Sequence, residues 1–141
     1  MSLDLTPLKS AVASLEAALE VVGDAGWFDR QSEQVKNTLI AGVMKNFEFV
    51  YEIGFKMIRR QIEAEAASPD EVDESSFRDV MRVAAEKGLI ADVEPWFQYR
   101  LLRNITAHTY DRAKARQVYE GTLRFIRDAR ELLRRLEARN V

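Results

Sequence analysis

The sequence predicts an all-α protein, an up-and-down bundle of four to five helices in a single domain spanning residues 1–141. Three observations predict this class. Only three prolines and six glycines interrupt the 141 residues. No stretch alternates apolar and polar residues as a half-buried strand would. Apolar residues instead recur every three or four positions, as they do along one face of a helix. With 47% hydrophobic residues, a chain of this length can bury its own core.

The same periodicity and the positions of capping residues divide the chain into helices. Serine and aspartate begin helices because their side-chain oxygens accept the unpaired N–H groups of the first turn, and glycine commonly ends them. We expect one helix from Leu5 to Val22, a long one from about Ser32 to Ala67, a third from Ser75 to Gly88, a short fourth opening at Asp92 and Pro95, and a last from Asp111 to about Arg139. Gly23 to Gly26 should form a turn after the first helix.

The long second helix is apolar over most of its circumference. One apolar stripe comprises Phe47, Val50, Tyr51, Gly54 and Ile58, a second comprises Phe49, Ile53 and Met57, and Lys45, Glu48, Glu52, Lys56 and Arg59 form a polar band between them. A core this small can cover one stripe, so the second stripe favours a two-fold homodimer. The alternative is a helix surrounded entirely by its own neighbours. The two carboxylates of this band, Glu48 and Glu52, either form ordinary ion pairs with the neighbouring cations or orient Arg103 or His108.

The segment from Arg103 to Tyr110 contains the single histidine of the chain, His108. Imidazole both gives and takes protons near neutral pH because its unperturbed pKa is about 6.5. Arg103 offers a fork of donors suited to phosphate, and the Tyr110 phenol can donate or accept a hydrogen bond. This set suits phosphodiester chemistry. A lone histidine in a helical protein can instead be a capping or partly buried structural residue.

The order Arg103, four residues, His108, one residue, Tyr110, within the segment 96–111, resembles the signature of the HEPN superfamily. The Arg-Asn and Ala-His-Thr-Tyr-Asp pieces are most similar to the nucleotidyltransferase substrate-binding branch, whose toxin relatives are called HepT. Phe47-Glu48-Phe49 and the segment 86–90 upstream also resemble that branch, in matching order. The resemblance covers roughly residues 30–125 and implies a dimeric HEPN-type bundle.

The resemblance implies metal-independent RNA cleavage at a dimer interface. Arg103 and Arg100 would then hold the phosphodiester, Asn104 would fix a loop carbonyl or a nucleotide edge, and His108 would act as general base or acid. Two His108 copies near a two-fold axis would supply both an acid and a base. One departure from the expected pattern is Leu102, where an acidic residue should precede Arg103.

The resemblance also implies a partner, a small nucleotidyltransferase, with the two proteins acting as a toxin–antitoxin module. The partner would neutralise the RNase by binding or by attaching a nucleotide to Tyr110. The alternative is a non-catalytic subunit that binds nucleotide or substrate for the transferase through the same pocket. A third possibility is a structural helical dimer without a site. Tyr110 could also serve only to pack its ring and bond the backbone.

Composition excludes several other classes. The chain has no cysteine, which excludes disulfides and thiolate metal sites, and no ligand pair has a recognised metal spacing. We therefore expect no metal and no cofactor. No apolar run approaches the ~20 residues that span a bilayer, so we expect a cytoplasmic protein. Residues 1–99 carry 10 basic and 18 acidic residues, whereas residues 100–141 carry 11 and 5. The excess of positive charge in residues 100–141 could attract RNA. Alternatively, the arginines of this segment could form a solvated helix face.

Overall fold

The computed structural model describes residues 2–67, 76–108 and 110–141, and it confirms the all-α class in these ranges. The helices are α1 (Thr6–Gly23), α2 (Ala25–Phe28), α3 (Glu33–Glu65), α5 (Phe77–Glu86), α6 (Glu94–Ile105), the short 3-10 helix η1 (Thr106–His108) and α7 (Arg112–Arg139). The five long helices match the five expected segments. The short α2 was not predicted, because the sequence there favours a turn.

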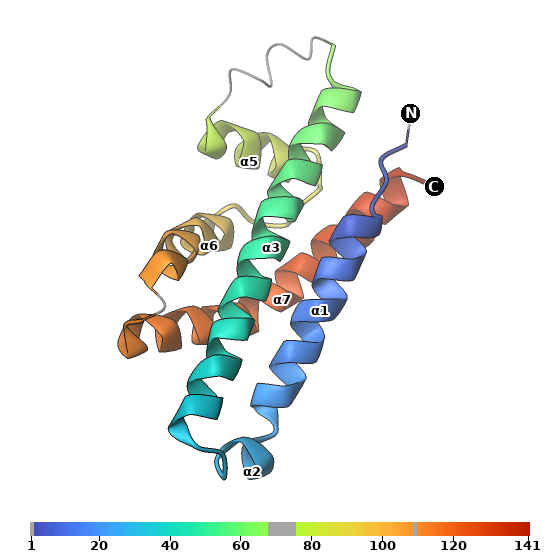
Figure 1. Cartoon of the computed structure of the whole chain (residues 1–141). Helices are drawn as coiled ribbons and strands as arrows, with labels where there is room; N and C mark the ends of the chain where they lie inside the picture. Colours follow the sequence, from blue (N-terminus) through green and yellow to red (C-terminus); the bar gives the residue numbers. More distant parts are fainter. Residues whose placement is uncertain (1, 68–75, 109) are drawn as a thin grey trace.

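The three longest helices, α1, α3 and α7, pack along one another, and α5 and α6 lie together on one side of α3 (Figure 1). The apolar stripe of α3 that includes Phe47 and Ile58 is buried, with both of these side chains 0% exposed. Phe125 of α7 meets Phe47 with ring centroids 4.8 Å apart, and it also contacts the rings of Trp96 and Tyr99 on α6. These aromatic contacts fix α6 against the bundle, and α6 leads directly into η1 and His108.

Two helix caps lie where the sequence predicts them, whereas α6, which was expected to open at Asp92, has Val93 at its N-cap. The Ser32 side chain accepts a hydrogen bond from the Val35 N–H, and the Asp111 carboxylate accepts one from the Lys114 N–H at 3.1 Å. The prediction for the third helix is corrected: its N-cap is Ser76, whose side chain accepts a hydrogen bond from the Asp79 N–H. Ser75, the expected cap, lies outside the described residues. The turn after α5 contains Gly88 with φ of 78°, a conformation that favours glycine.

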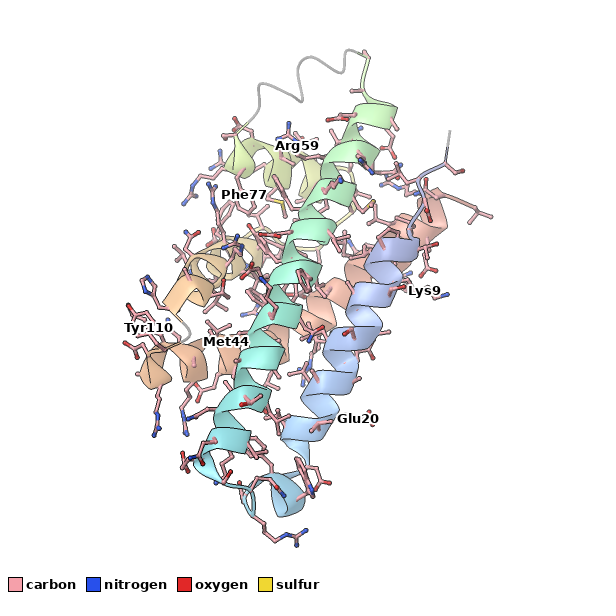
Figure 2. The ribbon with its side chains drawn as sticks, in the orientation of Figure 1. Lys9, Glu20, Met44, Arg59, Phe77 and Tyr110 are labelled. Atoms are coloured by element: carbon pink, nitrogen blue, oxygen red, sulfur yellow. The ribbon has the colours of Figure 1, made fainter. Side chains whose placement is uncertain are left out.

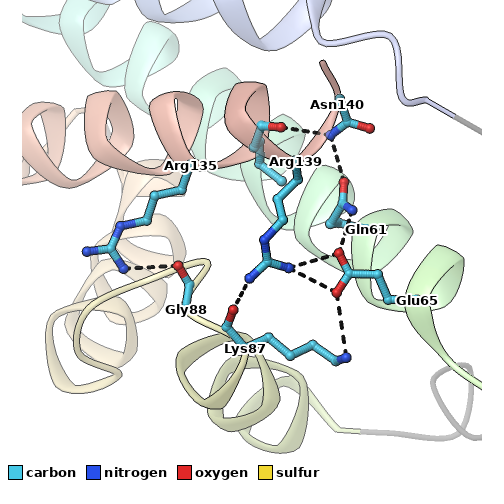
Figure 3. A network of polar contacts seen from close by, with 8 residues as sticks. Gln61, Glu65, Lys87, Gly88, Arg135, Arg139 and Asn140 are labelled. Carbon is cyan, nitrogen blue, oxygen red and sulfur yellow. Dashed lines mark hydrogen bonds and ion pairs between the residues drawn. The ribbon is translucent and has the colours of Figure 1, made fainter.

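A polar network joins the end of α7 to α3 and to the turn after α5 (Figure 3). Its members are Gln61 and Glu65 on α3, Lys87 and Gly88 after α5, and Arg135, Arg139 and Asn140 at the end of α7. Arg139 Nη1 lies 2.8 Å from Glu65 Oε2, and Arg139 Nη2 donates to the Lys87 carbonyl. Asn140 Oδ1 accepts from the Leu3 N–H at 2.9 Å. The network therefore fixes α5 and holds the two ends of the chain together.

None of the helices in the described ranges has the length and apolar character needed to cross a bilayer.

Candidate functional site

Arg103 lies in the last turn of α6 and faces the polar band of α3. Its Nε and Nη2 donate to Glu52 Oε1 at 2.9 and 2.6 Å, and Nη2 lies 4.0 Å from Glu48 Oε1. The hydrogen bond to Glu52, with further attraction from Glu48, raises the pKa of Arg103 above its ordinary value. The carboxylate partner that is missing at Leu102 is therefore supplied from α3. The remaining nitrogen, Nη1, takes no part in these two contacts.

Thr106, the first residue of η1, connects Arg103 to α3 and was not singled out from the sequence. Its Oγ1 lies 2.8 Å from Glu48 Oε2 and 2.6 Å from the Arg103 carbonyl, and the residue is 5% exposed. Burial opposes ionisation of Glu48, but the Thr106 hydroxyl, Arg103 and Lys45 outweigh it and lower the pKa of that carboxyl. Glu48 is thus a carboxylate that fixes the start of η1. A threonine three residues after the motif arginine is the signal that could have indicated this contact.

His108 and Tyr110 contact each other between η1 and α7. His108 Nδ1 lies 3.1 Å from the Tyr110 hydroxyl, and the rings meet edge to face with centroids 5.8 Å apart. His108 is half-buried, whereas Tyr110 is 81% exposed, so Tyr110 does not pack its ring into the core. With Nδ1 facing Tyr110, the other ring nitrogen, Nε2, takes no part in this contact.

Arg100 and Asn104 lie differently from Arg103. The Arg100 guanidinium stacks 4.5 Å from the centroid of the Phe77 ring, toward α5. Arg100 and Arg103 both lower the pKa of Tyr51, although its burial has the larger effect and raises that pKa to about 12. Asn104 is exposed at the end of α6. The predicted binding roles of Arg100 and Asn104 remain predictions.

Helix α6 packs closely on α7 at Leu102, the residue before Arg103. A Cβ atom added at Gly121 of α7 would overlap the Leu102 side chain, so Leu102 packs directly on α7 at this position. Leu102 thus has a packing role in place of the acidic residue expected before Arg103.

Acidic side chains lie beside the first turn of α7. The Asp111 carboxylate already accepts the Lys114 N–H, and Arg112 lies 3.8 Å from Glu33. A phosphate at this helix terminus would therefore meet a carboxylate. Among the described residues, no three or more histidine and carboxylate side chains converge as metal ligands do.

Comparison with known proteins agrees with this fold. The profile of the family described as "Nucleotidyltransferase substrate binding protein like" matches residues 3–138. A Haemophilus influenzae protein named "Probable ribonuclease HepT" is 43% identical over 138 residues, covering 98% of this chain and 94% of the relative. A solved Haemophilus influenzae structure superposes with a TM-score of 0.93 at 42% identity, covering 95% of this chain and 99% of that one. It is described as the fold of a substrate-binding domain of a nucleotidyltransferase.

These matches identify the class as a helical HEPN-like bundle of the HepT type. The chain belongs to the nucleotidyltransferase substrate-binding protein-like family.

Proposed function

We propose that this protein is a metal-independent endoribonuclease, the toxin of a two-protein toxin–antitoxin module, and that its partner is a small nucleotidyltransferase. The observation that carries the proposal is the arrangement of the motif. Arg103 is fixed by Glu52, and five residues later His108 is hydrogen-bonded to Tyr110. The similarity to a protein named probable ribonuclease HepT supports the same activity. We expect this pair to act in the cytoplasm.

The proposed reaction is an internal transfer within RNA. His108 removes the proton from a ribose 2′-OH, and that oxygen attacks the adjacent phosphorus. The bond from phosphorus to the 5′-oxygen breaks, and that oxygen takes a proton from an acid, leaving a 2′,3′-cyclic phosphate. Arg103 stabilises the charge that develops on the phosphate oxygens. A second His108 from another copy of the chain would be the acid.

The test is cleavage of single-stranded RNA by the purified chain in EDTA. We expect products ending in 2′,3′-cyclic phosphate, identified by mass. Loss of cleavage in EDTA, restored by a divalent metal, would contradict the proposed mechanism.

The alternative function is a non-catalytic subunit that binds nucleotide or substrate for the transferase. The family description and the description of the solved relative favour it. A folded wild-type chain that leaves RNA intact, binds the transferase and increases its turnover would establish this alternative.

A homodimer would bring two His108 side chains together, and α3 offers a surface for it. The residues of the second apolar stripe differ in exposure: Phe49 is 47% exposed, Ile53 is half-buried and Met57 is 3% exposed. We expect sedimentation to give twice the chain mass of 16.2 kDa, and Phe49→Asp to give a folded monomer. Met57→Asp should unfold the chain instead. A monomeric wild type would exclude the shared site.

Glu52 is proposed as a positioning residue for Arg103. We expect Glu52→Gln to lower kcat for RNA cleavage by about tenfold with a smaller change in KM, because a misdirected guanidinium loses its transition-state contact. Stability should change little, since the pair is exposed (33% and 48% of the side chains). Glu131→Gln is the matched control, because Glu131 pairs with Arg134 and Arg135. Equal activity in the two variants would exclude this role.

Tyr110 is proposed as the point of control by the partner. Its Oη attacks the α-phosphorus of ATP, the α–β phosphoanhydride bond breaks, pyrophosphate leaves, and the phenol proton passes to a base of the transferase. The attached nucleotide adds negative charge and bulk beside His108, which excludes RNA. We expect intact mass to show the adduct on wild type and not on Tyr110→Phe. Inhibition by the partner with Tyr110 unmodified would mean neutralisation by binding alone.

A further inference from the structure

A cleft of about 750 Å³, the Tyr110 cleft, lies between the end of α1, α2, the first half of α3 and the start of α7. Its volume falls in the ~300–1,000 Å³ range of sites that bind small molecules. Figure 2 shows Tyr110 at the edge of the molecule, beside the part of α3 that carries Met44, and both residues line the cleft. Tyr110 also contacts His108 through its hydroxyl. One side chain therefore borders both the cleft and the proposed catalytic residue.

The floor of the Tyr110 cleft is apolar and partly aromatic. Met44 and Ala115 are buried beneath it, at 1% and 9% exposure, and the rings of Phe28 and Tyr119 are half-buried in its walls. Flat heterocycles bind well against aromatic side chains, since every base has a π-face to stack. Such a floor suits a nucleobase.

The rim of the cleft carries both signs of charge in equal number: Asp29, Glu33, Glu120, Lys36, Arg112 and Arg116. Glu33 lies 3.9 Å from Lys36 and 3.8 Å from Arg112, so the two cations share this carboxylate. A path for RNA needs an excess of positive charge to displace counterions. A rim with equal numbers of both signs instead suits a ligand of low charge, with Arg116 as a donor to its single phosphate.

We propose that the Tyr110 cleft binds the nucleoside part of a nucleotide whose phosphate is joined to Tyr110 Oη. This inference rests on the proposed control of Tyr110. Tethering gives the nucleoside an effective concentration in the millimolar range, so even a weak site is occupied. The modified oxygen has lost its hydrogen, so it cannot donate one to His108 Nδ1. Occupation of the cleft thus fixes the phosphate next to His108, where substrate phosphate would bind.

The experiment is a titration of the unmodified full chain with AMP, monitored by NMR. We expect millimolar binding with shifts of the amides that line the cleft. Arg116→Gln should weaken AMP binding about tenfold, the size expected for losing a hydrogen bond to a charged group. Arg127→Gln, an exposed arginine on the same helix outside the cleft, should bind as wild type does. Ala41→Leu, which enlarges a side chain that lines the cleft, should also lose binding.

Three results would overturn the inference: no AMP binding by wild type, equal binding by Arg116→Gln and Arg127→Gln, or inorganic phosphate binding as tightly as AMP. A fourth would be a Tyr110-modified chain whose cleft amides do not shift as they do with AMP. The AMP titration requires neither RNA nor the transferase. Failure of RNA cleavage would therefore contradict the proposed function while AMP binding to the cleft still stands.

Discussion

His108→Ala is expected to lower the rate of RNA cleavage by about 10²- to 10⁴-fold, the contribution typical of a positioned general acid or base. The chain has no other histidine, so no second imidazole can take over within the same copy. The side chain is half-buried at the end of η1, and it is hydrogen-bonded to the exposed Tyr110. The fold should therefore survive the change, as circular dichroism and thermal unfolding would check.

Two companion variants make this result specific. Arg103→Lys keeps the positive charge but loses the planar fork of donors, so we expect it to be nearly as inactive as His108→Ala. Arg130→Lys is the matched control, because Arg130 also pairs with a glutamate, Glu16 at 2.8 Å, but on the α1 side of α7. Wild-type rates in a folded His108→Ala variant would rule out the proposed chemistry.

Phe125→Ala is expected to reduce the free energy of unfolding by about 3–5 kcal/mol, as deletion of a buried aromatic ring typically does. Phe125 is 0% exposed, and its ring contacts those of Phe47, Trp96 and Tyr99. The truncation leaves a cavity at the point where α3, α6 and α7 meet. Because domains of this kind are stable by only about 5–15 kcal/mol, much of the variant should unfold at modest denaturant concentration.

The measurement is equilibrium unfolding in urea, with Leu123→Ala as the control. Leu123 lies two residues away on α7 and is 46% exposed, so its truncation should change stability by no more than about 0.5 kcal/mol. If both variants lost the same stability, the aromatic cluster would not be the centre of the core. A partly folded Phe125→Ala chain should also lose RNA cleavage, since α6 positions Arg103.

The helices could be predicted from the sequence because their signals are local. The Ser32 and Asp111 caps depend on residues three positions away, and the apolar period of α3 is visible in one window. The short α2 was missed because four residues around Gly26 resemble a turn. The N-cap of α2 is Asp24, which lies inside the expected turn from Gly23 to Gly26.

The sequence groups the candidate site residues but does not predict their contacts. Arg103, His108 and Tyr110 are close in sequence, so their grouping follows from spacing. The pairing of Arg103 with Glu52 spans 51 residues and depends on how α6 crosses α3. The spacing of the charged residues along α3 does not indicate whether each one pairs within α3 or with a residue of another helix. Lys45 with Glu48 is the local pair, at 3.4 Å, and Glu52 makes the distant one.

The hydrogen bond between Leu3 and Asn140 has a practical consequence for constructing variants. It places the two ends of the chain beside each other, at the end of the bundle away from Tyr110 (Figures 1 and 2). A fluorescent protein or an affinity handle fused at either end would leave the motif and the Tyr110 cleft accessible. Adjacent ends also permit circular permutation, so the two ends could be joined by a short linker and new ends opened between α1 and α3. Such a permutant would allow a reporter to be attached beside the cleft.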